Sequence, residues 1–200
     1  MELLDWLPVV AAVFAVPQFL PQLIAVWRTA DVAGVSWLWA ALTSISNGAW
    51  IAYFAAARLW TALVPAISAT VLAGILAWLI ARRAAVTRTA VASASGWTAL
   101  LTLTWFVAGP VGLGTVLTAS FVLQVAPQVW AAYRTRRPTG ISRGTWLLIL
   151  GELACWGVFG LHIADPRLTV LGWTGVTASM LVLARVAYGR RRSARMGHAP

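Results

Sequence analysis

Two apolar stretches of the chain carry polar side chains near their middle. The first, SWLWAALTSISNGAWIAYF, has Ser46 and Asn47 at its centre and Trp50 one helical turn after Ser46. The second, RGTWLLILGELACWGVFGLHI, has Glu152 at its centre and Trp156 one turn further on. Residues i and i+4 share a face of a helix, so each stretch presents a polar group beside an indole ring. If both faces look inward, they predict a polar chamber in which these five residues bind a small polar solute.

Glu152 adds acid–base chemistry to this candidate site. A carboxyl group in the middle of an apolar helix is costly and is typical of a solute or proton pathway. Glu152 is therefore the candidate for proton coupling, with a neutral, hydrogen-bonded packing residue as the alternative. For Asn47 and the two tryptophans, Trp50 and Trp156, a packing role stays equally open.

The elements that must hold these residues are membrane helices. The chain is 60% hydrophobic and 10% charged, a balance that a soluble domain of this size could not shield from water. A helix needs about 20 mostly apolar residues to cross a bilayer. The sequence predicts an all-α polytopic membrane protein with seven spans, at 4–27, 36–57, 60–81, 90–108, 112–133, 143–163 and 168–187. The span at 90–108 begins with polar residues, and a six-span alternative leaves it at the membrane surface.

The arginines predict how the spans are oriented, because basic loops stay on the cytoplasmic side. With seven spans and the N-terminus outside, 13 of the 15 arginines fall on the inner side, and only Arg58 and Arg167 fall outside. We therefore expect a multi-pass protein of the cell membrane with a cytoplasmic C-terminus. Abundant Ala, Arg and Trp without lysine suggest a bacterial source.

An internal repeat organises the chain. The segment PQLIAVWRTADVAGVS, Pro21–Ser36, aligns without gaps on PQVWAAYRTRRPTGIS, Pro127–Ser142, at an offset of 106 residues. The same offset pairs Gln18 with Gln124, Ser46 with Glu152, and Trp50 with Trp156. We predict a three-helix unit at 1–83, a linker transmembrane helix at 84–110, a second three-helix unit at 111–189, and a basic tail at 190–200 that can contact anionic lipid. A single linker helix gives both units the same orientation.

Each copy of the repeat begins with Pro-Gln inside an apolar run. Proline removes a backbone donor and bends a helix, so Pro21 and Pro127 are predicted hinges, with a static kink as the alternative. In lipid the freed carbonyl needs another donor, and the side-chain amides of Gln22 and Gln128 are nearby candidates. Pro17 has no proline counterpart, so we expect a stronger kink in the first unit.

Paired Pro-Gln motifs, short basic loops with Gly-x-Ser and repetition after a linker helix resemble the PQ-loop superfamily. That group includes the SWEET and SemiSWEET sugar transporters, the cystinosin-like amino-acid exporters and the KDEL receptor. The resemblance implies a 3+1+3 fold and an alternating-access carrier with one site near mid-membrane, between the two units. Related sugar carriers use a pair of asparagines, whereas Asn47 has Leu153 as its counterpart here. The aspartates near the Pro-Gln motifs of the cystinosin-like branch are not matched either.

Other classes find little support in the sequence. The chain has no lysine for a retinal Schiff base, and it lacks phosphate-loop and zinc-protease motifs. It also lacks a cluster of Cys and His typical of a metal site. We therefore expect no enzyme activity, no cofactor or metal, and no nucleic-acid partner. Two hypotheses remain: a carrier of a sugar or an amino acid, with proton coupling through Glu152 as an option, and a non-transporting receptor or scaffold on the same fold. The few charges on the outer loops favour the carrier.

Overall fold

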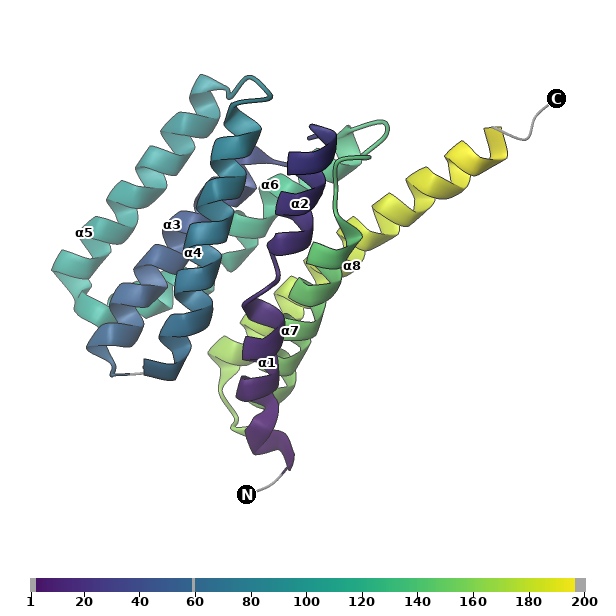
Figure 1. Cartoon of the computed structure of the whole chain (residues 1–200). Coiled ribbons are helices and arrows are strands. Elements are labelled where there is room, and N and C mark those ends of the chain that lie inside the picture. Colours follow the sequence, from purple (N-terminus) through teal and green to yellow (C-terminus); the bar gives the residue numbers. More distant parts are fainter. Residues whose placement is uncertain (1–2, 59, 197–200) are drawn as a thin grey trace.

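The computed structural model describes residues 3–58 and 60–196, except for the side chains of Leu3, Asp5, Thr61, Arg167 and residues 190–196. Helices and short connections make up this part of the chain, and no strand occurs in it (Figure 1). The side chains of the predicted basic tail at 190–200 are therefore not among those that the structure describes. The elements are η1 (Leu3–Trp6), α1 (Leu7–Ala15), α2 (Leu20–Thr29), α3 (Trp37–Ala56), α4 (Trp60–Ala81), α5 (Arg88–Ala119), α6 (Phe121–Arg134), α7 (Arg143–His162) and α8 (Pro166–Met196).

Five helical stretches in the described residues are long and apolar enough to cross a membrane. They cover residues 7–29, 62–81, 88–134, 143–162 and 168–189. The all-α architecture and these candidate spans agree with the membrane protein that the composition predicts. The stretch at 88–134 is 47 residues long and contains a sharp change of direction.

Gly109 makes that change of direction inside α5. Its φ of 63° and ψ of −164° are not helical, and glycine adopts such a conformation without the steric cost that a side chain would bring. Pro110 follows at once and cannot continue the preceding helical hydrogen bonds. Residues 88–108 and 110–119 are therefore two limbs, and they separate within the gap between the spans predicted at 90–108 and 112–133.

The first predicted span is broken, and the break lies before Pro21. Helix α1 ends at Ala15 and α2 starts at Leu20, with Pro17 in the intervening turn. Pro21 lies in the first turn of α2, where proline costs no hydrogen bond. In the second unit Pro127 lies inside α6 and the chain turns earlier, at Ser120. Both helices are thus interrupted upstream of the Pro-Gln proline, and the longer interruption contains Pro17.

The helices form two groups joined by two bridging helices. Helix α3 packs on both α4 and α5, and α7 packs on both α1 and α8; Figure 1 shows α2 and α6 between these two groups. Helix α2 contacts α4 and α7, while α6 contacts α8 and α3. The connections at 30–36, 82–87 and 135–142 lie at one end of the bundle, which we call the PQ end.

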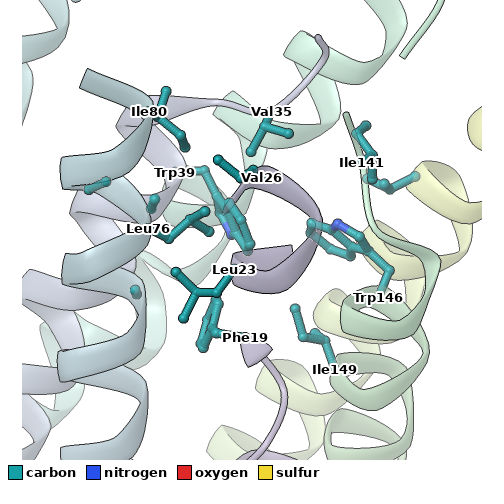
Figure 2. Packing of buried hydrophobic residues seen from close by; sticks show 14 of the residues in the cluster. Phe19, Leu23, Val26, Val35, Trp39, Leu76, Ile80, Ile141, Trp146 and Ile149 are labelled. Atoms are coloured by element: carbon teal, nitrogen blue, oxygen red, sulfur yellow. The ribbon is translucent and has the colours of Figure 1, made fainter. Parts of the chain in front are cut away.

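A buried aromatic cluster packs the two groups together near the PQ end (Figure 2). The Trp39 ring of α3 lies 5.6 Å from that of Phe19 and 5.2 Å from that of Trp146 on α7, measured between ring centroids. Val26 of α2 is fully buried beside them. Helix α7 also packs closely on α8, because a Cβ on Gly172 would overlap the backbone of Gly157. Small residues at such crossings let helix backbones approach in a membrane.

Candidate functional site

The side chain of Gln22 connects the first unit to the loop of the second. Its Nε2 donates to the carbonyl oxygen of Gly140 at 2.7 Å, and its Oε1 accepts from the backbone N–H of Ser142 at 2.7 Å. Gln22 is 1% exposed. Its amide therefore satisfies one buried acceptor and one donor, both in the second unit. From the sequence we expected this amide to bond within its own helix instead.

Gln128 makes the same connection in the opposite direction. Its Nε2 donates to the carbonyl oxygen of Gly34 at 2.8 Å, and its Oε1 accepts from the N–H of Ser36 at 2.8 Å. Gln128 is fully buried. We call these two reciprocal contacts the crossed glutamines. They link the Pro-Gln of each unit to the Gly-x-Ser of the other.

The two loops that receive the crossed glutamines lie directly against each other. The N–H of Gly140 donates to the carbonyl oxygen of Ala33 at 3.0 Å. A Cβ on Gly140 would lie 2.6 Å from the Ala33 nitrogen, and a Cβ on Gly34, whose φ is +84°, would lie 2.7 Å from the Cβ of Pro138. The close approach of the loops therefore requires glycine at both positions. This contact between the loops closes the PQ end.

The serines of the two Gly-x-Ser motifs also begin the helices that carry the predicted site. The Ser36 hydroxyl accepts from the N–H of Trp39 at 3.1 Å, and the Ser142 hydroxyl accepts from that of Thr145 at 3.5 Å. Such caps satisfy a free donor at a helix start. The crossed glutamines therefore hold the first residues of α3 and α7, and with them the placement of both helices.

Glu152 meets the broken first helix near the middle of the bundle. Its carboxyl group lies beside the side chains of Gln18 and Trp156, which can donate to it through the amide N–H and the indole N–H. Gln18 is 6% exposed and Glu152 is partly exposed. Helix α1 packs on α7 here, with Phe14 3.1 Å from where a Cβ on Gly151 would lie. The interruption at Pro17 thus places an amide beside the carboxyl group.

Ser46, the counterpart of Glu152, lies in a different environment. Its hydroxyl accepts from the indole N–H of Trp97 on α5 at 2.9 Å, and it is 1% exposed. Trp50 stacks on Phe54 at 5.3 Å and meets Tyr53 edge-on at 5.3 Å. Trp50 and Tyr53 pack against leucines of both limbs of α5, namely Leu101, Leu113 and Leu117. This part of α3 is covered by α5.

The side-chain amides of Asn47 and Gln124 bond to nearby groups of the chain. The Nδ2 of Asn47 donates to the carbonyl oxygen of Thr43, one turn earlier in its own helix, at 2.9 Å. Gln124, the counterpart of Gln18, donates to the carbonyl oxygen of Leu117 at 3.2 Å and to the hydroxyl of Ser120 at 3.3 Å. Gln124 lines a pocket of about 310 Å³ between α3, α5 and α6, together with Trp97.

Four of the five predicted site residues have two different sets of neighbours, while Asn47 bonds within its own helix. Glu152 and Trp156 lie with Gln18, whereas Ser46 and Trp50 lie with Trp97. A chamber shared by all five stays a prediction. Gln18 could have been given a role from its alignment with Gln124 at the repeat offset. Trp97 carried no such signal, because its position near a span start is typical of an interfacial aromatic.

Comparison with protein-family models and with curated proteins found no match for this chain. Among the described residues, no three His, Cys, Asp or Glu side chains lie together as a metal site. The chemistry available at the Glu152 group is thus hydrogen bonding and proton exchange at one carboxyl group, hydrogen bonding at one amide, and contact with one indole.

Proposed function

We propose that the protein is an alternating-access carrier of a small polar solute, a sugar or an amino acid, in the cell membrane. In this proposal seven spans are arranged as 3+1+3, as in the PQ-loop superfamily, with the N-terminus outside and the C-terminus in the cytoplasm. The 13 arginines expected on the inner side include those of the PQ end, which would then face the cytoplasm.

The crossed glutamines carry the proposal. Alternating access needs two units that can separate at one end and rejoin there. The contacts at the PQ end join the units through hydrogen bonds that run in both directions between them. When the loops part, the four backbone groups and two amides can bond to water instead, so opening leaves few groups unsatisfied.

The proposed hinges lie next to these contacts. Pro21 and Pro127 directly precede the crossed glutamines, and each helix is interrupted upstream of its proline. A bend at the interruption would move the glutamine away from the opposite loop while leaving the rest of the unit intact. Pro21, Gln22, Pro127 and Gln128 thus form the proposed hinge region.

The Glu152 group is the proposed solute and proton site. Glu152 is partly exposed as a residue, and its carboxyl group lies beside the possible donors Gln18 and Trp156. A hydroxyl or amine of a solute could replace either partner, while the indole covers an apolar face of the solute. Proton uptake by the carboxyl group would then compete with solute binding, which is the physical basis of coupling.

A receptor or scaffold on the same fold is the second candidate. It is favoured by the full burial of Ser46 against Trp97, which leaves only one of the two aligned positions partly exposed. Such a protein would keep the crossed glutamines closed, and the PQ end would have no reason to open.

Transport assays separate these candidates. Uptake into proteoliposomes is measured with a panel of labelled sugars and amino acids, with and without a pH gradient, beside protein-free vesicles. The carrier predicts saturable uptake of at least one solute and its loss when Cys replacements at residues 33 and 139, in opposite loops, are cross-linked. Absence of flux for every solute, or flux unchanged by the cross-link, would contradict the carrier.

A further inference from the structure

A long apolar groove runs between α6 and α8 on the outside of the bundle. Its volume is about 1410 Å³, more than the roughly 300–1,000 Å³ of most small-molecule pockets. Ala126, Trp130, Trp173 and Thr174 are among the residues that line it. Trp130 is 66% exposed, so the groove is open along the side that faces the bilayer.

The polar atoms of the groove are largely occupied within the protein. The Thr169 hydroxyl donates to the carbonyl oxygen of Asp165, and that of Thr177 donates to the carbonyl oxygen of Trp173, each at 2.8 Å. The Tyr133 hydroxyl donates to the carbonyl oxygen of Leu181 at 3.3 Å and so joins α6 to α8. An occupant of the groove must therefore be apolar along most of its length.

The PQ end of the groove is basic. Arg134 follows Trp130 by one turn, and its guanidinium carbon lies 6.0 Å from the Trp130 ring centroid. Arg185 follows Leu181 by one turn, and its Nη2 donates to the carbonyl oxygens of Thr135 and Arg136 at 2.7 and 3.1 Å. These contacts hold the guanidinium of Arg185, on α8, against the C-terminal end of α6. Asp31 is the one acidic residue in the sequence of the PQ-end connections.

We propose that this groove binds a phospholipid with an anionic headgroup. The acyl chains lie along the apolar groove, and the headgroup phosphate contacts Arg134 and Arg185. Arginine suits this role, because its planar fork of N–H donors matches phosphate oxygens. The site is separate from the tail at 190–200, and it does not depend on transport.

Charge argues against a second copy of the chain as the occupant. A copy inserted in the same orientation would bring its own basic PQ end to the same level of the membrane. Like charges facing each other oppose such an interface, whereas an anionic headgroup neutralises them. A lipid also fills an apolar groove in the bilayer without requiring a complementary protein surface.

Native mass spectrometry of the intact purified chain tests the proposal. Phosphatidylglycerol and phosphatidylcholine with identical acyl chains are the probes. The wild-type chain should retain one phosphatidylglycerol more tightly than phosphatidylcholine. Arg134→Gln should weaken phosphatidylglycerol binding about fivefold and leave phosphatidylcholine binding unchanged. The matched control is Arg82→Gln, since Arg82 also stacks one turn after a tryptophan, 5.0 Å from the Trp78 ring, on another helix.

A second pair of variants tests the groove itself. Ala126→Trp fills the groove and should reduce binding of both lipids, whereas Ala99→Trp on the exposed face of α5 should not. Equal retention of the two lipids by the wild type, or equal effects within either pair of variants, would overturn the proposal. A change of oligomeric mass in Ala126→Trp with unchanged lipid binding would overturn it in favour of an interface between copies.

Discussion

The two copies of the repeat make equivalent contacts at the PQ end but different contacts further along α3 and α7. At the PQ end, the crossed glutamines match closely, with donor–acceptor distances of 2.7 and 2.7 Å for Gln22 and 2.8 and 2.8 Å for Gln128. In the helices that follow, the same offset pairs the carboxyl group of Glu152, which lies beside Gln18, with the hydroxyl of Ser46, which accepts from Trp97. The repeat is therefore symmetric where the two loops meet and asymmetric at Ser46 and Glu152, where the solute site is proposed.

Geometry explains this difference. Two loops that contact each other across a shared axis must each supply what the other needs, so a change in one copy leaves a buried group in the other unsatisfied. A mid-helix side chain has no such reciprocal partner. Ser46 and Glu152 could therefore acquire separate neighbours while the backbone repeat stayed intact.

Removing a crossed glutamine should have the largest effect. Gln22→Leu leaves a buried carbonyl and a partly buried N–H without partners, and each unsatisfied group costs about 1–3 kcal/mol. We expect the free energy of unfolding in detergent to fall by roughly 2–6 kcal/mol. Gln128→Leu should cost a similar amount, because its contacts are equivalent. A large difference between the two variants, measured by denaturant titration, would break the symmetry argued above.

Replacing Glu152 should affect function more than stability. Glu152→Gln keeps the size of the side chain but removes the exchangeable proton, so the pH-gradient dependence of uptake should disappear. Hydrogen bonds to charged groups contribute about 1.5–3 kcal/mol, which corresponds to roughly a tenfold or greater loss of uptake at low solute concentration. Ser46→Ala is the matched change in the other unit and should leave the pH dependence unchanged. Uptake of Glu152→Gln that still follows the pH gradient would rule out coupling through this residue.

The loop glycines should tolerate no side chain. Gly140→Ala would place a Cβ 2.6 Å from the Ala33 nitrogen, and overpacking of this kind costs about 1–3 kcal/mol. Gly96→Ala is the control, because nothing lies within 4 Å of its added Cβ and alanine favours a helix by about 1 kcal/mol. Thermal unfolding should therefore shift down for Gly140→Ala and up for Gly96→Ala. Equal shifts would argue against close contact of the loops.

The smallest effect is expected at the covered counterpart of the carboxyl site. Trp97→Phe removes the indole N–H that donates to Ser46, and a neutral hydrogen bond contributes about 1 kcal/mol. A double-mutant cycle with Ser46→Ala measures this coupling directly. A coupling energy near zero would show that Trp97 packs against α3 without the hydrogen bond contributing to stability.

Several boundaries followed from local sequence alone. The bounds predicted at 60–81 and 143–163 agree closely with α4 and α7, at Trp60–Ala81 and Arg143–His162, which contain candidate membrane spans. The bounds predicted at 36–57 agree with helix α3, Trp37–Ala56, which is not among the five candidate spans. Apolar length, a serine cap and a following turn are all readable over a few residues. The gap expected after residue 108 contains Gly109 and Pro110, two residues whose backbone preferences act locally.

The partners of the polar side chains did not follow from local sequence. Gln22 was expected to serve its own helix, yet its amide bonds to a loop 118 residues away. Pro21 was expected to bend a helix, yet it lies in the first turn of α2, after the interruption. In each case the deciding neighbour is remote in the chain, and a proline pattern alone does not tell a kink from a helix start.

The sequence by itself determined the membrane class, the repeat and the residues that differ between its copies, because composition, spacing and alignment are properties of the chain. Only the tertiary structure decided that Gln22 and Gln128 each bond to the loop of the other repeat copy. It also decided that Gln18 lies beside Glu152 and that Trp97 covers Ser46. The physical reason is that a hydrogen bond depends on the direction and distance of two groups, and helix packing sets both after the chain has folded.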